Sequence, residues 1–461
     1  MAVNRYAPDT LNADTMLQPL MSLQHTTLFF WGQNRLVNLI PFLLSWITAP
    51  LANLWAHLWL YAFSFFAFLA VLAFAGATRL HPGIAWGRRW LLFLAMTAVS
   101  LVILLPASAS VLLIEGHPYA PSFLLLSIAA LILTRDGASV WSQAMAVVCL
   151  FAAIGLNPSG ALVALSLAVL WLVGLPMRKV IVIVVATIVC LGAWLALSKL
   201  GPEPPYSYFS IGLGSLGGDL GQALDAMYDA VQPAGLALVA CALAVGFFAG
   251  LGSPRRGRER HAVLYLTALA VGWWLAFATN EWVKTANQSH FRYFSVSILA
   301  LAIAASLLLF SFVRDASRTA RTLFGTACAA IIIGLLWRAP VGWSRYLVVG
   351  WVAEYVDFAE RNDVTFVVGD YWVSWPTVFE LIRRGKPGLG LAWRGEGNRA
   401  AIVAAIETDL RNGKQPRALC LVEPAAACVD AALRISGFRW VEVLEPCPAG
   451  QCLVIQVQRA N

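Results

Sequence analysis

The stretch LWAHLWLYAFSFFAFLAVLAFAGA, residues 54–77, decides the fold class of this chain. It contains no Asp, Glu, Lys or Arg, and a helix of this length crosses the roughly 30 Å hydrocarbon core of a bilayer. The whole chain of 461 residues is 60% hydrophobic and only 12% charged, about half the charged share of an ordinary soluble domain. The sequence therefore predicts a polytopic α-helical membrane protein.

Further apolar runs follow that first one, and together they predict ten transmembrane spans. Allowing for tilt and a few short helices, the approximate limits are 54–77, 89–108, 118–134, 140–156, 160–176, 180–198, 234–251, 262–279, 294–312 and 322–338. We divide the chain into a first outer loop over 1–53, a transmembrane domain over 54–345 and a C-terminal domain over 352–461.

The distribution of cations predicts the orientation of these spans. Alternate connections are basic, and they contain Arg79, Arg88, Arg89, Arg135, Arg178, Lys179, Arg255, Arg256, Arg258, Arg260, Arg314, Arg318 and Arg321. The opposite connections hold few cations, chiefly Lys199, Lys284, Arg292 and Arg338. By the positive-inside rule the basic side is cytoplasmic, and an even span count places both termini outside. The net charge of +8 is thus a topology signal, and no nucleic-acid partner is expected.

The composition changes near residue 352 and predicts a small α/β domain on the outer face. NDVTFVVGDYWVSWPTVFELIRRGKPGLGLAW (362–393) has the pattern of a buried strand, a turn and a helix. NRAAIVAAIETDLRNGKQPRALCLVEPAAACVDAALRISGF (398–438) follows as helix, strand and helix, and then come two strand-like runs, RWVEVLE (439–445) and CLVIQVQ (452–458).

Four of the eight cysteines lie in this predicted outer domain: Cys420, Cys428, Cys447 and Cys452. An oxidising compartment allows pairing, and we favour Cys447 with Cys452 across CPAGQC; the alternative is that both are unpaired small hydrophobes. No second Cys or His pair stands at zinc-ligand spacing. We expect no cofactor, and a role for a divalent ion is left open.

Polar groups that can do chemistry are concentrated in the predicted outer loops. The first loop contains Asp9 and Asp14, followed by WGQNR (31–35), while a long loop rich in Gly, Pro and Tyr spans 199–233. TNEWVKTANQSHFRYF (279–294) sets cations beside aromatic residues at the start of a span. Nothing resembles a Walker loop or a dinucleotide fingerprint, so an ATP-driven pump is not expected.

Three of these motifs resemble the GT-C superfamily of polyprenyl-phosphate-dependent membrane glycosyltransferases, in an uncharacterised bacterial branch. NADTMLQPL (12–20) stands where the family has an acidic outer-loop motif, HFRYF (290–294) resembles its phosphate-binding entrance, and GDYWVSWP (369–376) resembles the opening of its C-terminal domain. Many members show two adjacent acids where this chain has a single Asp. The abrupt polar start MAVNRYAPDT also suggests that the family's first helix is missing.

The resemblance implies a sugar transfer on the outer face of the bacterial inner membrane, from a polyprenyl-phosphate carrier to a glycan, lipid or protein acceptor. A phosphate leaves as an anion, so the reaction needs a carboxylate to deprotonate the acceptor hydroxyl and cations to hold the phosphate. A single displacement would invert the anomeric centre. Asp14 is the first candidate for that carboxylate and Asp9 the second.

The other candidate site residues are substrate-binding. Arg292, Tyr293, His290 and Lys284 are candidates for the carrier phosphate, Gln33 and Arg35 for the lip of the cavity, and His117 and Tyr119 for its lining. Each has a structural alternative. Asp14 could be a helix N-cap, Arg292 a snorkelling anchor and Tyr293 part of an aromatic belt, and the region of His117 a turn made by Pro118 and Pro121. Asp370 and Tyr371 are expected to be turn and packing residues.

Two other function classes remain open from the sequence. A secondary transporter would show related halves and charged residues at mid-membrane, whereas these spans are almost free of charge and no internal repeat is found. An O-antigen polymerase or ligase would also bind polyprenyl carriers with outer-loop cations, but would use a large outer loop between late spans. A non-enzymatic assembly factor is a further alternative.

Overall fold

The computed structural model describes residues 12–24, 26–31, 33–81, 83–104, 111–113, 118–166, 176–201, 211–212, 216–229, 231, 237, 257–285, 287–337, 350–392, 398–421, 438–446 and 453–459. It divides into two compact units. The described parts of 59–197 and 205–339 form the first, and those of 10–58, 198–204 and 340–461 form the second.

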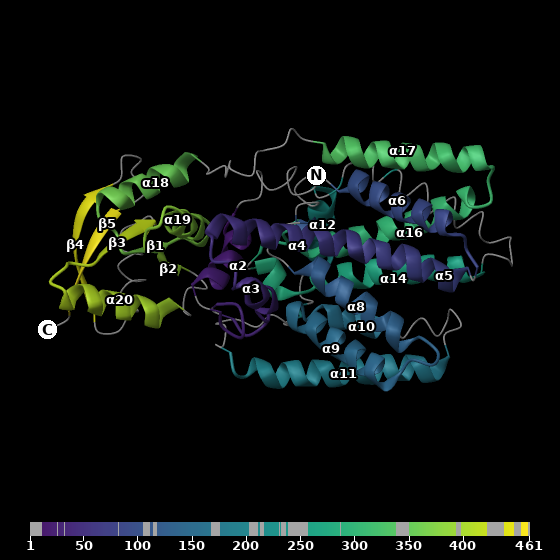
Figure 1. Cartoon of the computed structure of the whole chain (residues 1–461), viewed down its shortest axis with the longest axis horizontal. Coiled ribbons are helices and arrows are strands. Elements are labelled where there is room, and N and C mark those ends of the chain that lie inside the picture. The colour runs from purple at the N-terminus through teal and green to yellow at the C-terminus, as the bar shows by residue number, and fades with distance from the viewer. Residues whose placement is uncertain are drawn as a thin grey trace. The chain divides into compact units, whose positions relative to one another are not determined.

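The first unit is a bundle of apolar helices (Figure 1). Its helices are α4 (Pro50–Val71), which begins in the second unit, and η2 (Leu72–Gly76), α5 (Ala77–Leu80), α6 (Trp86–Ile103), α8 (Tyr119–Leu133), α9 (Val140–Leu156), α10 (Gly160–Ser166), α11 (Met177–Ser198), α12 (Leu216–Asp229), α14 (Gly257–Ala278), α15 (Glu281–Thr285), η5 (Phe291–Tyr293), α16 (Ser295–Val313) and α17 (Arg318–Leu336).

Six of the described helices are long and apolar enough to cross a membrane: Pro50–Gly76, Trp86–Ile103, Met177–Ser198, Glu259–Ala278, Ser295–Val313 and Arg318–Leu336. Two shorter apolar helices, α8 and α9, coincide with the third and fourth predicted spans. The fifth predicted span is described only as far as Ser166, and the seventh, 234–251, lies almost wholly outside the described residues. The structure therefore supports a multi-pass membrane protein, while the count of ten stays a prediction.

Helix α16 lies at the centre of the bundle. It contacts α6, α14 and α17. In its most apolar stretch of 18 residues, 78% is buried inside the protein, against 11% in the corresponding stretch of α17. Since α17 leaves most of its apolar surface uncovered, lipid is the solvent that suits that surface. The bundle therefore has an inner helix beside η5 and peripheral helices that face outward.

The second unit joins the N-terminal segment to a mixed β-sheet. Its strands are β1 (Phe366–Gly369), β2 (Leu389–Ala392), β3 (Arg417–Leu421), β4 (Phe438–Pro446) and β5 (Leu453–Arg459), in the order β2-β1-β3-β5-β4. The first three strands are parallel, and β5 pairs antiparallel with both β3 and β4. Strands β1, β3, β4 and β5 occur where strand-like runs predicted them, whereas β2 was not predicted, because its stretch was assigned only one strand, a turn and a helix.

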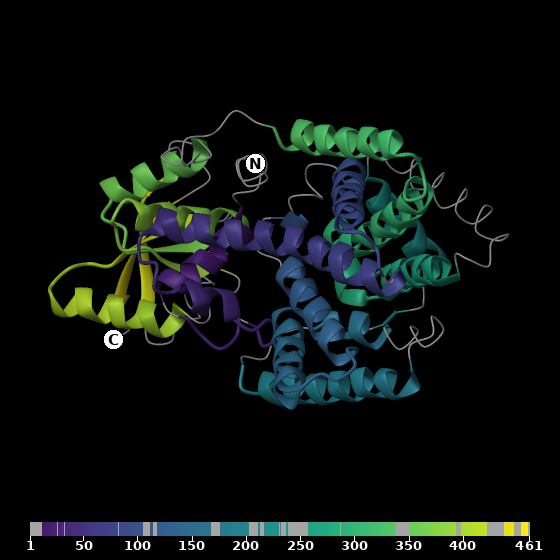
Figure 2. The same cartoon turned by 45° about the vertical axis from the view of Figure 1, so that its right-hand side comes forward.

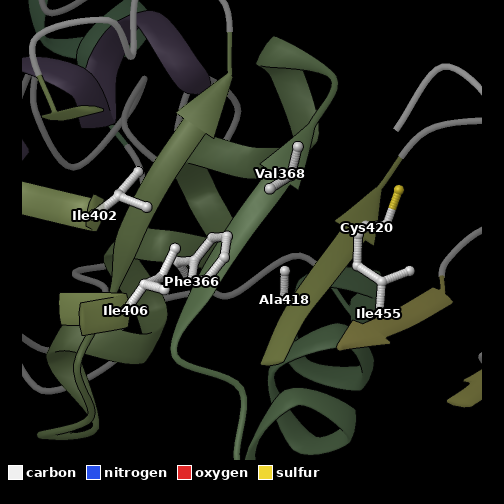
Figure 3. Close-up of a cluster of buried hydrophobic side chains, with 7 residues drawn as sticks. All are labelled: Phe366, Val368, Ile402, Ile406, Ala418, Cys420 and Ile455. Carbon is white, nitrogen blue, oxygen red and sulfur yellow. The ribbon is translucent and has the colours of Figure 1, made fainter. Parts of the chain in front are cut away.

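Helices cover both faces of the sheet (Figure 2). They are α18 (Gly350–Arg361), α19 (Tyr371–Arg383) and α20 (Arg399–Arg411), with α18 and α20 on opposite sides. Figure 3 shows Ile402 and Ile406 of α20 facing Phe366 of β1 in a fully buried cluster. Parallel strands need such crossovers and burial on both faces, which explains why their sequences are continuous apolar runs.

Cys420 of β3 lies in the same core and is disulfide-bonded. Its partner is not among the described residues, and neither member of the expected Cys447–Cys452 pair is described. Of the described cysteines, those in the helical bundle, Cys149, Cys190 and Cys328, are free thiols.

Candidate functional site

Asp14 is a buried carboxylate near the start of α2 (Ala13–Leu23), with 5% of its surface exposed. The N-cap of this helix is Asn12, whose side chain accepts a hydrogen bond of 3.1 Å from the backbone N–H of Thr15. The capping alternative for Asp14 is therefore wrong. Its Oδ1 instead accepts a hydrogen bond of 2.5 Å from the hydroxyl of Tyr371.

The helix that carries Asp14 is attached to the sheet of its own unit. Helix α2 packs against α19, and Gln24 at its end donates a hydrogen bond to the carbonyl of Gly388. The indole rings of Trp31 and Trp375 lie 5.7 Å apart. The orientation of the Asp14 carboxylate is thus set by residues from both ends of the chain.

The segment that contains Gln33 and Arg35 is a short closed loop in the same unit. Phe29 bridges Val37, and the Asn38 amide donates to the carbonyls of Phe29 and Thr27 at 2.7 and 3.0 Å. Gln33 is 1% exposed, and neither its amide oxygen nor its amide nitrogen has a hydrogen-bond partner among the described residues. Arg35 is half-buried.

In the helical unit, Lys284 joins two predicted outer loops. Its Nζ lies 2.7 Å from Asp219 Oδ2 on α12 and 2.9 Å from Glu281 Oε1 on α15. Hydrogen bonds to these two carboxylates raise the pKa of Lys284. A Cβ at Gly212 would stand 1.3 Å from Glu281 Oε1, so a side chain at this position would displace the Glu281 carboxylate. The ion pairs give Lys284 a local partner for its charge, and make it a structural tie.

Arg292 lies in the turn of η5 that opens α16, and it is 8% exposed. Its Nη2 donates to Asn287 Oδ1 at 2.8 Å and to Tyr293 Oη at 3.0 Å, and Tyr293 Oη donates to the same Asn287 oxygen at 2.8 Å. The guanidinium carbon is 5.0 Å from the centre of the Tyr293 ring. Asn287 and Tyr293 thus hold the guanidinium of Arg292 in a fixed orientation.

Aromatic side chains hold Tyr293 in place. Its ring stacks on Phe277 at 5.9 Å and meets Trp282 edge-on at 5.5 Å, and its backbone carbonyl accepts a hydrogen bond of 2.8 Å from Trp273 Nε1. His290 is exposed, and its Nδ1 accepts from the backbone N–H of Arg292 at 3.4 Å. The structure thus brings Arg292, Tyr293 and His290 together in one turn.

The remaining predicted residues have separate places. Tyr119 is the first residue of α8, is 5% exposed, and has its ring 6.1 Å from that of Phe123. Asp9 and His117 lie outside the described residues. Asp370 is the N-cap of α19, where its side chain accepts from Trp372 N, as expected of a turn residue. The expectation for Tyr371 was incomplete, because it bonds Asp14 as well as packing.

An apolar cavity of about 760 Å³ opens inside the helical unit. Its lining includes residues of α4, α8, α14 and α16, such as Phe68, Leu126, Leu266 and Ile303, together with Thr134, Arg135 and Asp136. The described residues contain no group of His, Cys, Asp and Glu side chains that would hold a metal ion.

Comparison with known proteins shows a likeness in fold. No protein-family model matches the chain, and no curated protein matches it. Among solved structures, the crystal structure of ArnT from Cupriavidus metallidurans bound to undecaprenyl phosphate matches with a TM-score of 0.54 and 13% sequence identity, over 99% of this chain and 93% of that one. At this identity the likeness concerns the fold alone, and the fold agrees with the one that the sequence resemblance implied.

Proposed function

We propose that this chain, with the fold of a GT-C glycosyltransferase, moves a sugar from a polyprenyl-phosphate carrier to an acceptor hydroxyl. The observation that carries the proposal is the buried carboxylate of Asp14, held by Tyr371 in a chain of this fold. A fold by itself hosts many functions, and the buried Asp14 carboxylate is the group that could act as the base of a sugar transfer. The matching structure contains undecaprenyl phosphate, which supports a polyprenyl phosphate as the carrier here.

In the proposed reaction, Asp14 takes the proton of the acceptor hydroxyl as its oxygen attacks the anomeric carbon. The bond between that carbon and the phosphate oxygen breaks, and the electron pair leaves with the phosphate. The product sugar is inverted in a single displacement, with no covalent enzyme intermediate. Because the phosphate is already a good leaving group, no general acid is required.

We assign the leaving phosphate to Arg292, with His290 beside it. A guanidinium can donate two parallel hydrogen bonds to a phosphate, and the contacts with Asn287 and Tyr293 fix its plane. We assign Lys284 a structural role in holding the outer loops together, because it forms ion pairs with two carboxylates. Gln33, Arg35 and Tyr119 are proposed to contact the substrates, as are Asp9 and His117 beyond the described residues.

The proposed location is the outer face of a bacterial inner membrane, with the sheet unit in the periplasm. The bonded state of Cys420 supports this side, because structural disulfides persist in oxidising compartments. Arg260 at the start of α14 and Arg318 at the start of α17 belong to the basic set predicted to face the cytoplasm.

The test is a transfer assay with purified full-length protein in nanodiscs. Radiolabelled sugars on undecaprenyl phosphate are offered, and release of the free carrier phosphate is measured together with label in lipid, glycan and protein fractions. Carrier release that requires Asp14 supports the proposal. If no sugar-loaded carrier binds, or if release proceeds equally without Asp14, the proposal is wrong.

A further inference from the structure

Two buried side chains one turn apart on α4, Asn53 and His57, present hydrogen-bond acceptors that no described donor meets. Asn53 is 0% exposed and His57 is 2% exposed. Because positions i and i+4 share a face of a helix, both side chains belong to one buried strip. The hydrophobic runs of the sequence had placed them at the edge of a span without assigning them a role.

The orientation of the Asn53 amide is fixed by its own hydrogen bonds. Its Nδ2 donates to the backbone carbonyls of Leu44 at 3.0 Å and Ile47 at 2.9 Å. Carbonyl oxygens only accept, so the nitrogen must point at them. The other amide atom, Oδ1, is therefore an acceptor, and it has no partner among the described residues.

The same reasoning fixes the tautomer of His57. Its Nδ1 lies 2.9 Å from the backbone carbonyl of Asn53, so Nδ1 carries the proton. Burial disfavours a charged imidazolium with no described acidic partner. The other ring nitrogen, Nε2, then holds a bare lone pair, and it too has no partner among the described residues.

Ser64, a further buried polar side chain of α4, does not share this state. Ser64, 3% exposed, donates to the carbonyl of Leu60 at 2.7 Å and is satisfied by its own helix. A buried acceptor without a donor is costly, and such groups persist where a ligand or a water completes them. Because Asn53 Oδ1 and His57 Nε2 are both acceptors and lie on one face of the helix, a ligand that binds them must donate hydrogen bonds.

We propose that Asn53 Oδ1 and His57 Nε2 are a receptor for the hydroxyl groups of a sugar. A phosphate or carboxylate offers only acceptors and would be repelled by this pair, whereas adjacent sugar hydroxyls offer two donors. The inference rests on the proposed function, since a glycosyltransferase must hold the sugar apart from the phosphate that carries it. The hydroxyls belong either to the donor sugar or to the acceptor.

The experiment compares binding of two probes to the full chain in nanodiscs: undecaprenyl phosphate alone, and undecaprenyl phosphate carrying a hexose. His57→Leu removes the acceptor, His57→Gln restores one near the position of Nε2, and Ser64→Ala is the matched control on the same helix. We expect His57→Leu to weaken binding of the loaded carrier by about tenfold, the loss of one net hydrogen bond. Binding of the bare carrier should not change, and His57→Gln should bind more tightly than His57→Leu.

A second readout separates binding from folding. Without ligand, the melting temperature of His57→Leu should be no lower than that of the wild type, because the substitution removes a buried acceptor that lacks a donor. If His57→Leu does not fold, His57→Met in the same assay takes its place. If donor binding is unchanged but the KM for the acceptor rises, the hydroxyls are those of the acceptor.

The proposed receptor is wrong if His57→Leu weakens binding of the bare and the loaded carrier equally. It is also wrong if the variant changes neither the binding of the loaded carrier nor the KM for the acceptor. Those outcomes leave the proposed function intact, because the wild type still binds the loaded carrier. Failure of the wild type to bind either probe overturns the proposed function and the receptor together.

Discussion

The hydroxyl of Tyr371 on α19 donates a hydrogen bond of 2.5 Å to Oδ1 of Asp14 on α2, across 357 positions of sequence. Both side chains are 5% exposed. A hydrogen bond from a phenol to an ionised carboxylate is charge-assisted, and such bonds are among the stronger ones in proteins. The sheet unit therefore orients the carboxylate that we propose as the base.

Tyr371→Phe removes this bond and leaves the ring in place. Losing a hydrogen bond to a charged group, worth about 1.5–3 kcal/mol, should lower kcat roughly 10- to 100-fold and leave the KM for the donor unchanged. Tyr355→Phe, another buried tyrosine of the same unit, is the control. A fall in melting temperature with unchanged kcat per folded molecule would make Tyr371 a packing residue only.

Asp14→Asn should abolish transfer, because an amide can accept the bond from Tyr371 but cannot take a proton. Its melting temperature should stay close to the wild-type value, since the change exchanges one hydrogen-bond acceptor for another at a cost of about 1 kcal/mol. The control is Asp363→Asn in an exposed turn at φ 49°, a conformation that Asn adopts readily. A folded, fully active Asp14→Asn protein would exclude Asp14 as the base.

Three variants at Arg292 separate phosphate binding from anchoring. If it binds the leaving phosphate, Arg292→Ala should lower turnover roughly a hundredfold, like other losses of a transition-state donor. The turnover of Arg292→Lys should fall between those of Arg292→Ala and the wild type, because an ammonium group cannot donate the two parallel hydrogen bonds of a guanidinium. A snorkelling anchor would instead tolerate Lys fully, and Ala would lower the membrane yield without changing turnover. Turnover per folded molecule is the measurement, and equal values for all three remove Arg292 from the site.

Lys284 should stabilise the fold in a pH-dependent way. Its pKa is raised in the folded protein by Asp219 and Glu281, so the stabilisation is complete below the ordinary lysine value of 10.5 and is lost as the pH rises through the higher folded value. Lys284→Met should lower the melting temperature at pH 7. The melting temperature of this variant should also depend less on pH in the alkaline range than that of the wild type. Asp219→Asn should show a smaller loss, and thermal melts across the alkaline range check both. A Lys284→Met protein that melts like the wild type at pH 7 would show that the ion pairs of Lys284 do not stabilise the fold.

Cysteine labelling tests the topology. Single cysteines in a cysteine-free background at Arg260, which is exposed, and at Gly217, where a Cβ meets nothing within 4 Å, should react from opposite sides. The position at Arg260 should label only from the cytoplasm, as the basic connections predict. Labelling of both positions from one side would disprove the predicted orientation.

The sequence predicted well those features that depend on local pattern. Apolar runs predicted α4, α6, α11, α16 and α17 to within a few residues, because membrane helices must satisfy their backbone internally over a fixed length. Strand-like runs predicted β1, β3 and β5 for the same local reason.

Features that join distant segments were not predicted. Nothing near Tyr371 in the sequence points to Asp14, and nothing near Asp219 points to Lys284, since each partner is chosen by packing over long separations. The N-cap of α2 was missed for a different reason. Asn and Asp are about equally favoured as caps, and the structure places the cap at Asn12, two residues before Asp14.

The central position of α16 bears on how the protein is made. Two buried serines on this helix bond to its own carbonyls, Ser306 to Ala302 at 2.7 Å and Ser311 to Leu308 at 2.8 Å, so these two add little penalty in bare lipid. The helix can therefore enter the bilayer without waiting for neighbours. Because α6 and α14 precede it in the chain and α17 follows, the middle of the bundle can assemble during translation, before the last span and the sheet have left the ribosome.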